Sequence, residues 1–193
     1  MAPAPQRYRI MHKLDDTVVY LTEAYKAIVA NRRIPYNPTT ETAEVIKKAA
    51  RWLCEDRKPG LLLYGCFGTG KTTLAKAISL SIMTLSSKPV IIKNARTLAN
   101  MAADNDPNFD AIKQSDMLFI DELGREPVSV LNFGTKISPA IELLEFRYDK
   151  QLLTIVTSNA TDKDLLSLYG EHITERITEN FDKINFDFNS YRQ

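Results

Sequence analysis

Hydrophobic and polar positions along this chain follow two different periods, and the changes between them predict its elements. Beyond residue 60, short apolar runs of strand length alternate with longer stretches whose apolar residues recur at helical spacing. The strand-like runs are residues 61–64, 90–92, 117–120, 152–157 and 184–188, and the helix-like stretches are residues 71–83, a polar region up to 114, 137–148 and 165–180. This alternation is typical of a parallel sheet with helices on both faces, so we expect an α/β fold.

The first thirty residues carry a different pattern. Residues 1–14 contain basic side chains and prolines but no acid, which predicts a flexible basic arm. A helix is predicted over residues 17–30, because an apolar stripe recurs there at helical spacing. The stripe consists of Val18, Leu21, Tyr25 and Ile28. This helix could dock a partner protein, or it could simply pack on the rest of the chain.

A break and a second helix come next. Two prolines interrupt the periodicity within residues 31–40. The following apolar spacing predicts a helix over residues 41–54, with Thr40 as its N-cap. We therefore expect an N-terminal segment, residues 1–33, and a main domain, residues 34–193.

Composition narrows the function classes. The chain has 193 residues, of which 44% are hydrophobic and 25% charged, and this suits one globular domain. A formal net charge of +1 lacks the excess of a dedicated duplex-DNA binder, so nucleic-acid contact would need a local patch or several subunits. Cys54 and Cys66 lie apart, with no histidine cluster beside them, which argues against a disulfide framework or a zinc site. No apolar run approaches the roughly 18 residues of a membrane span, so we expect a cytoplasmic protein.

A glycine-rich motif follows the first apolar run and precedes a helical stretch. Residues 65–72, GCFGTGKT, fit the pattern G-x-x-x-x-G-K-[ST]. Glycines let backbone N–H groups approach phosphate oxygens without intervening Cβ atoms, and the N-terminus of the next helix favours anions. Lys71 would reach the β- and γ-phosphates, and the Thr72 hydroxyl would coordinate Mg²⁺. The motif in this context predicts a nucleotide site.

Two further apolar runs end in polar side chains that would meet at one edge of a parallel sheet. Asp121 and Glu122 close the third run, where Asp121 would hold the Mg²⁺ shell and Glu122 would act as general base on the attacking water. Asn159 follows the fourth run and could orient that water if its strand lies between the other two. Taken alone, the acids are also typical of a solvated turn, and the asparagine of a turn or cap. The glycine-rich motif upstream favours the catalytic interpretation.

Five segments, in their order and spacing, resemble the AAA+ ATPases of the DnaC/IstB type, which are bacterial helicase loaders and transposition helper proteins. The segments are GCFGTGKTTLAKAI, FIDELG, LLEFRYDKQLLTIVTSNAT, YGEHITERI and NFDFNSYR. The resemblance covers residues 34–192. It implies a P-loop NTPase fold of the AAA+ (ASCE) type, with a five-stranded parallel sheet flanked by helices and a short helical N-terminal segment.

The resemblance also implies roles for single residues. Asp121 and Glu122 would be the Walker B pair, Asn159 the sensor-1 residue, and Arg176 an arginine finger for the ATP of a neighbouring subunit. The Mg²⁺ ion would lie at Thr72 and Asp121. The Walker A loop and the residue after it would hold ATP through Gly65, Cys66, Phe67, Gly68, Thr69, Gly70, Lys71, Thr72 and Thr73.

Some positions depart from the family pattern. Cys66 stands where such loops often have Pro or Lys, which is tolerable because that position contributes mainly backbone. His172 stands where the family often has a second arginine. Few residues follow Arg176, so we expect no C-terminal helical lid and no sensor-2 arginine of the usual kind, for which Arg192 would be a weak substitute.

The resemblance implies a Mg²⁺-dependent ATPase that forms a homo-oligomer with ATP at its subunit interfaces. It would assemble on single-stranded DNA and deliver a replicative helicase. A transposition helper that meets a transposase would share the same active site. A small-molecule kinase and an ATP-gated switch that barely hydrolyses are further alternatives, although the adjacent acids and the Arg176 segment favour an ATPase.

The loop after the acid pair leaves two interpretations open. Arg125 and Lys136 could line a channel for single-stranded DNA in an oligomer, or they could be solvated loop charges. Phe133 could stack on a base, or it could pack beneath the loop.

Overall fold

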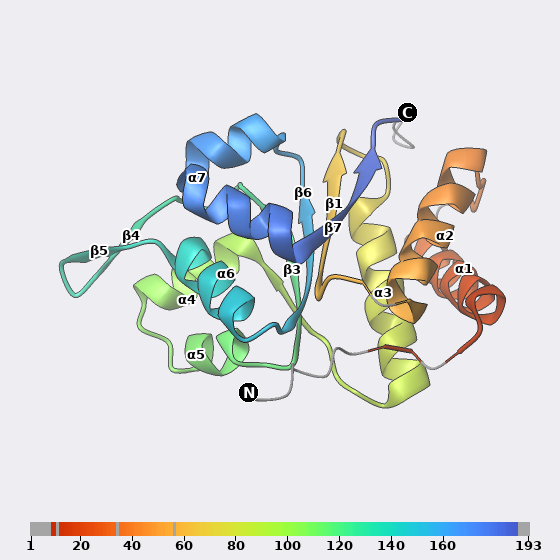
Figure 1. The fold of residues 1–193 in the computed structure, drawn as a ribbon, viewed down its shortest axis with the longest axis horizontal. Helices are drawn as coiled ribbons and strands as arrows, with labels where there is room; N and C mark the ends of the chain where they lie inside the picture. The colour runs from red at the N-terminus through yellow and green to blue at the C-terminus, as the bar shows by residue number, and fades with distance from the viewer. Residues whose placement is uncertain (1–8, 11, 34, 56, 189–193) are drawn as a thin grey trace.

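The computed structural model describes residues 9–10, 12–33, 35–55 and 57–188. This part of the chain forms a central sheet with helices on both faces (Figure 1). In chain order the elements are α1 (Leu14–Asn31), α2 (Thr40–Cys54), β1 (Gly60–Gly65), α3 (Lys71–Ser86), β2 (Ile91–Asn94), α4 (Ala95–Ala103), α5 (Asn108–Lys113), β3 (Met117–Leu123), β4 (Val130–Asn132), β5 (Thr135–Ile137), α6 (Pro139–Asp149), β6 (Leu153–Ser158), α7 (Asp162–Asn180) and β7 (Phe181–Phe186). None of the helices in the described ranges has the length and apolar character needed to span a membrane.

The central sheet has five parallel strands in the order β2-β3-β6-β1-β7. β6 lies between β1 and β3, and Ile155 of β6 is level with Leu61 on one side and Phe119 on the other. Since parallel strands end at one edge, the residues that follow β1, β3 and β6 meet there. The predicted five-stranded parallel sheet is confirmed.

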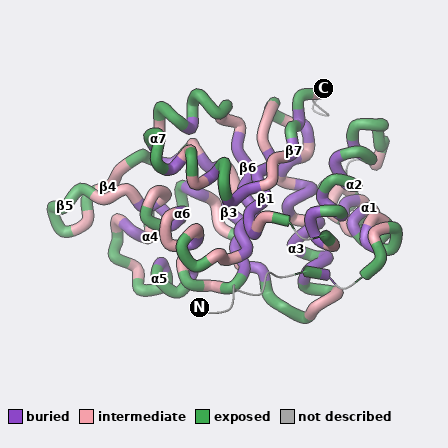
Figure 2. Tube along the Cα trace, viewed as in Figure 1, coloured by how far each residue is buried: buried purple, intermediate pink, exposed green. Residues whose placement is uncertain are grey.

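Successive residues of β1 divide between two hydrophobic cores, as expected for side chains that alternate across a strand. Leu61 and Leu63 belong to the core under α1, α2 and α3, whereas Leu62 belongs to the core under α4, α6 and α7. Figure 2 shows the buried residues concentrated along the strands between these two layers. Burial on both faces explains why the strands read as continuous apolar runs.

The N-terminal segment is joined to the first of these cores. Residues 1–8 of the expected arm lie outside the described residues. Ile10 is 4% exposed, and its backbone N–H donates to the carbonyl oxygen of Leu53 over 2.9 Å. Leu21 and Tyr25 of α1 are buried in the core that α1 shares with α2 and α3, so the apolar stripe faces inward. Docking of a partner on α1 would have to use its outer face, and both that docking and the division at residue 33 stay predictions.

The start of α2 differs from the expectation by one residue. The cap is Thr39, whose Oγ1 accepts a hydrogen bond from the Thr42 N–H at 3.3 Å, and helical geometry begins at Thr40. Thr42 Oγ1 accepts in return from the Thr39 N–H at 3.2 Å. The prediction of Thr40 as N-cap is therefore wrong, because only Thr39 has a partner three residues ahead that completes the reciprocal pair.

Two other segments were not predicted in their observed form. The expected helix over 165–180 is interrupted at Gly170, whose φ of 81° and ψ of 171° divide α7 into two helical parts. The loop after β3 forms the antiparallel hairpin β4–β5, which extends away from the body of the molecule (Figure 1). Phe133 lies in its turn and is 89% exposed, so it does not pack beneath the loop.

Candidate nucleotide-binding site

Glycines shape the loop that follows β1. Gly65, Gly68 and Gly70 have φ values of 122°, 75° and 95°, in the region that other residues enter only with strain. A Cβ at Gly65 would lie 2.7 Å from the carbonyl oxygen of Phe186 in β7, so the strand neighbour itself excludes a side chain. α3 begins at Lys71, directly after the loop, and the unpaired N–H groups of its first turn favour an anion there.

Lys71 is the first residue of α3, and its side chain reaches back into this loop. It is 6% exposed, and its Nζ donates to the carbonyl oxygen of Gly65 at 2.9 Å and to that of Cys66. Burial lowers the pKa of Lys71, while the nearby Cys66 and Asp121 oppose that shift. The ammonium group is thus held inside the loop by carbonyl oxygens, at the position where a phosphate group would meet it.

Thr72 and Asp121, the two residues predicted to hold Mg²⁺, are in direct contact. Thr72 Oγ1 donates to Asp121 Oδ1 at 2.8 Å, and Thr157 Oγ1 of β6 donates to the same oxygen at 2.6 Å. A hydroxyl and a carboxylate are the hard oxygen donors that Mg²⁺ takes, with phosphate and water completing its octahedral shell. No cluster of three or more metal-ligating His, Cys, Asp or Glu side chains is found in the described ranges. The donor set therefore fits Mg²⁺.

An irregularity in β3 places Glu122. The pairing of β3 with β6 shifts register between Ile120 and Leu123, and Glu122 has a φ of 61°. Its backbone N–H donates to Thr157 Oγ1 at 2.9 Å, so this hydroxyl group joins the backbone of Glu122 to the side chain of Asp121. Bulges of this kind redirect side chains next to active sites. Here the bulge brings Glu122 into the lining of a cavity beside the glycine-rich P-loop, residues 65–72.

The Glu122 carboxylate has two partners. Oε2 accepts from Asn94 Nδ2 at the end of β2, over 3.2 Å, and Oε1 forms an ion pair with Arg125 Nη1 at 2.8 Å. The Arg125 guanidinium also lies over the ring of Phe67 in the P-loop, 5.2 Å from its centroid. Arg125 is therefore engaged at this site although it is exposed, and both interpretations of it, a DNA contact and a solvated loop charge, stay predictions.

Asn159 follows β6 at the same edge of the sheet, as its prediction requires. It is half-buried, but it does not contribute to the lining of the cavity. The polar contact to the acid pair comes instead from Thr157, two residues earlier and inside β6. This role follows only once β6 is known to lie beside β3.

A buried pair supports the loop after β3. Glu126 is 7% exposed, and its carboxylate accepts from the Gly124 N–H at 2.9 Å and from the Tyr169 hydroxyl group of α7. Burial, followed by the charge of Glu126, raises the pKa of Tyr169 far above its usual range. The pair therefore links the loop that follows Glu122 to the first helical part of α7, just before the interruption at Gly170 that separates it from the part carrying Arg176.

Arg176 lies away from the cavity, on the part of α7 that packs against α6. Its Nη1 is 3.7 Å from Glu145 Oε1 and 3.6 Å from Asp149 Oδ1, and its guanidinium lies 4.9 Å from the ring centroid of Tyr148. His172 Nδ1 is 3.3 Å from the same Glu145 oxygen, so the two residues share one helix face. The ion-pair partners come from α6, not from the neighbouring acids of α7.

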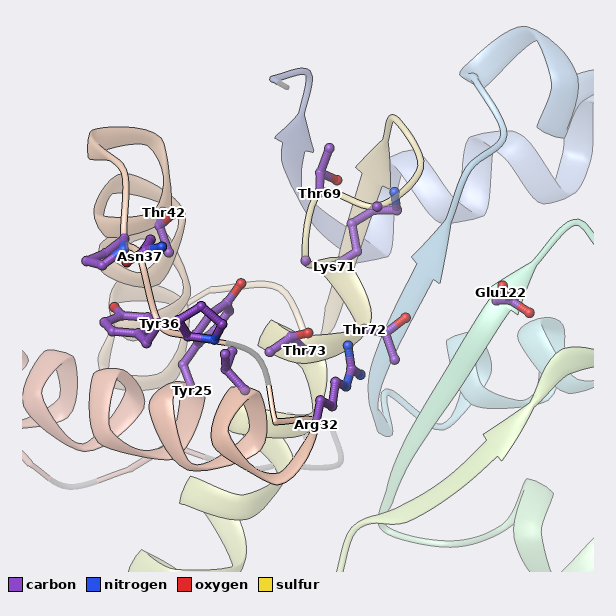
Figure 3. Close-up of a pocket in the computed structure, with 15 residues that line it drawn as sticks. Tyr25, Arg32, Tyr36, Asn37, Thr42, Thr69, Lys71, Thr72, Thr73 and Glu122 are labelled. Carbon is purple, nitrogen blue, oxygen red and sulfur yellow. The ribbon is translucent and has the colours of Figure 1, made fainter. Parts of the chain in front are cut away.

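A cavity of about 320 Å³ lies between the P-loop and the N-terminal segment (Figure 3). On one side it is lined by residues 68–73 and Glu122, and on the other by α1, the segment 35–38 and Thr42. Arg32, Tyr36 and Asn37 in this second wall were not expected at the site. No local motif marks them, because their place depends on the packing of α1 against α3.

Comparisons with known proteins identify a family and similar folds. Residues 61–168 match the ATPase family associated with various cellular activities (AAA). Among solved structures, the DnaC helicase loader is 20% identical with a TM-score of 0.63, covering 78% of this chain and 93% of that one. DnaI is 23% identical with a TM-score of 0.62, covering 85% and 93%. The replication initiator DnaA, bound to AMPPCP and single-stranded DNA, is 14% identical with a TM-score of 0.59, covering 80% and 49%.

No curated protein sequence matches the chain significantly. The solved structures share its fold at low identity, and the predicted likeness to DnaC-type ATPases is confirmed at that level. The P-loop and the acid pair both fall within the matched residues 61–168. The chain belongs to the AAA family of ATPases.

Proposed function

We propose that this protein is a Mg²⁺-dependent ATPase that assembles as an oligomer on single-stranded DNA and delivers a replicative helicase. The observation that carries the ATPase assignment is the contact of Thr72 with Asp121 beside the P-loop, together with Glu122 at the lip of the same cavity. The fold likeness to the DnaC helicase loader and DnaI supports the role in helicase delivery.

The residues of the site divide the work of hydrolysis among them. The glycine-rich loop would surround the phosphates with backbone N–H groups, and Lys71 would exchange its carbonyl partners for phosphate oxygens. Thr72 and Asp121 would hold Mg²⁺, which offsets phosphate charge and aligns the oxygens when it is bound. Thr157 fixes the orientation of Asp121, since its hydroxyl group donates to the carboxylate.

Glu122 is the proposed general base. Both of its carboxylate oxygens have partners within the chain, Asn94 and Arg125. Each carboxylate oxygen has a second lone pair, so the attacking water can donate to Glu122 while Asn94 and Arg125 hold the side chain in place. Asn159 would orient the same water from the end of β6, and Arg176 would act on the ATP of the adjacent subunit.

The DNA contact would come from the hairpin β4–β5 and the loop that leads to it. Phe133 is exposed and could stack on a base, and Lys136 on β5 is exposed beside it. The likeness to DnaA, whose solved structure holds single-stranded DNA, supports this contact. The transposition-helper alternative shares the same active site and stays a prediction.

An ATPase assay with and without single-stranded DNA tests the proposal, combined with capture of purified replicative helicases in the presence of ATP. We expect hydrolysis that requires Mg²⁺, and DNA binding that improves with a non-hydrolysed ATP analogue because several hairpins then align in one oligomer. Affinity for DNA should fall with salt. Equal DNA affinity with and without nucleotide would contradict the proposed coupling, and phosphate transfer to a small molecule instead of water would favour a kinase.

A further inference from the structure

Arg32 stands at the C-terminal end of α1, outside every motif that identified the site. Its backbone N–H donates to the carbonyl oxygen of Val29 at 3.0 Å, which keeps the residue attached to the last turn of the helix. α1 itself is anchored by Leu21, which is fully buried, and by Tyr25, which is 5% exposed. The position of Arg32 is therefore set by a packed helix.

The side chain of Arg32 shares a cavity with the phosphate-binding machinery. Arg32 lines this cavity together with Lys71, Thr72 and Glu122. Figure 3 shows its side chain extending from the end of α1 toward Thr72, at the start of α3. Since the first turn of α3 offers N–H groups to an anion, Arg32 faces the place where phosphate oxygens would lie.

The guanidinium group of Arg32 has no carboxylate partner within the described ranges. Other arginines of the domain do have partners: Arg125 pairs with Glu122, and Arg176 pairs with two acids of α6. An arginine that lines a cavity without an acid beside it keeps its five donors available for a ligand. A guanidinium suits phosphate best, because its planar fork matches two oxygens at once.

We infer that Arg32 binds the phosphate chain of the nucleotide from within the same subunit. This inference rests on the proposed nucleotide binding and adds a second fixed cation opposite Lys71. Lys71 and one divalent cation offset only part of the charge of a triphosphate, so a further cation has a clear electrostatic role. Because Arg32 is attached to α1, phosphate binding would also be coupled to the position of α1 and of the segment 35–38 that follows it.

Calorimetry on the full chain tests this assignment with two probes, Mg·ATP and Mg·tripolyphosphate. Arg32→Ala should weaken both by about ten-fold or more, since a hydrogen bond to a charged group is lost. Arg32→Gln, which keeps most of the stem, should lose as much. Arg33→Ala is the matched control, because Arg33 is the adjacent arginine and does not line the cavity. The control should bind like the wild type.

The outcomes separate the two levels of the proposal. Failure of the wild type to bind either probe would refute the nucleotide site itself, whatever Arg32 does. If the wild type binds and Arg32→Ala matches it, or loses no more than Arg33→Ala, the assignment of Arg32 is overturned. A lower affinity for Mg·ATP alone, with the affinity for Mg·tripolyphosphate unchanged, would also overturn it, because Arg32 would then contact the nucleoside and not the phosphates. Thermal melting of each variant checks that the exposed substitution leaves the fold intact.

Discussion

The cluster around Thr72 and Asp121 and the Arg176 face of α7 are both part of the proposed ATPase, yet they are held in different ways. Asp121 is fixed by two short hydrogen bonds from within its own chain. Arg176 is held by two long ion pairs, at 3.6 and 3.7 Å, to acids that are 60% and 37% exposed. Exposed pairs of this kind contribute at most about 1 kcal/mol. The first region is held entirely by contacts within this chain, whereas the second would exchange its partners at little cost in the proposed oligomer.

Lys71→Ala removes the ammonium group next to the Thr72–Asp121 cluster and should have the largest effect. Mg·ATP binding should be abolished, because the loop loses the buried ammonium group that meets the phosphates while its glycines remain. Calorimetry measures the loss. Lys76→Ala, a lysine one turn further along α3, is the control and should bind normally. Unchanged affinity in Lys71→Ala would show that the P-loop is not the nucleotide site.

Arg176→Ala tests the second region, the Arg176 face of α7. In GTPases, an arginine supplied to the reaction by another subunit or protein is worth about 10³–10⁵ in rate. We expect a loss of ATPase activity on that scale. ATP binding should be retained, because Arg176 does not line the nucleotide cavity of its own chain.

Mixing then distinguishes a role across the interface from a structural one. Arg176→Ala protein combined with Lys71→Ala protein should regain part of the activity, since some interfaces pair an intact P-loop with an intact arginine. If mixed oligomers are confirmed to form and no activity returns, Arg176 acts only within its own subunit, as one member of the ion pairs with α6.

Glu122→Gln sharpens the comparison inside the first region. The amide keeps the shape of the side chain but cannot accept the proton of water, so hydrolysis should slow by about 10²–10⁴. ATP affinity should stay close to that of the wild type, which separates this variant from Lys71→Ala. Single-turnover hydrolysis alongside calorimetry measures both quantities. Turnover near the wild-type rate would show that another group accepts the proton of the attacking water.

The difference between the two regions also explains what the sequence could predict. Residues 65–72 and the acid pair lie at the ends of strands or directly after them, so motif and local context were enough to place them at one edge of the sheet. Asn94 and Thr157 depend on which strands lie beside β3, and this order is set by packing across the whole sheet. Arg32 depends on a helix that is remote in sequence from the P-loop and packs against α3.

Buried charges were the least predictable feature. Arg147 is 1% exposed and donates to Thr154 Oγ1 at 2.8 Å and to the carbonyl oxygen of Leu153 at 2.7 Å, beneath the start of β6. Burial lowers its pKa to about 9. A helical stretch with one arginine gives no sign of such burial, because the carbonyl partners, those of Lys113, Ser115 and Leu153, belong to other segments of the chain. Only the assembled fold brings them together.

Tyr169→Phe should have the smallest effect, and it tests whether the two regions are mechanically joined. The variant removes only the hydroxyl group that donates to Glu126, leaving one oxygen of a carboxylate that is 7% exposed without this donor. Loss of one partner of a buried hydrogen bond costs about 1–3 kcal/mol, which chemical denaturation can measure. Tyr148→Phe is the matched control, since it also removes a hydroxyl group that donates to a glutamate, but at an exposed position. The control should change stability by no more than about 0.5 kcal/mol.

The ATPase rate provides the second readout. If the Glu126 pair joins the loop after Glu122 to α7, Tyr169→Phe should also lower this rate while leaving the affinity for Mg·ATP unchanged. A loss of stability with no change in rate would mean that the pair supports the fold alone. The Thr72–Asp121 cluster and the Arg176 face of α7 would then act independently.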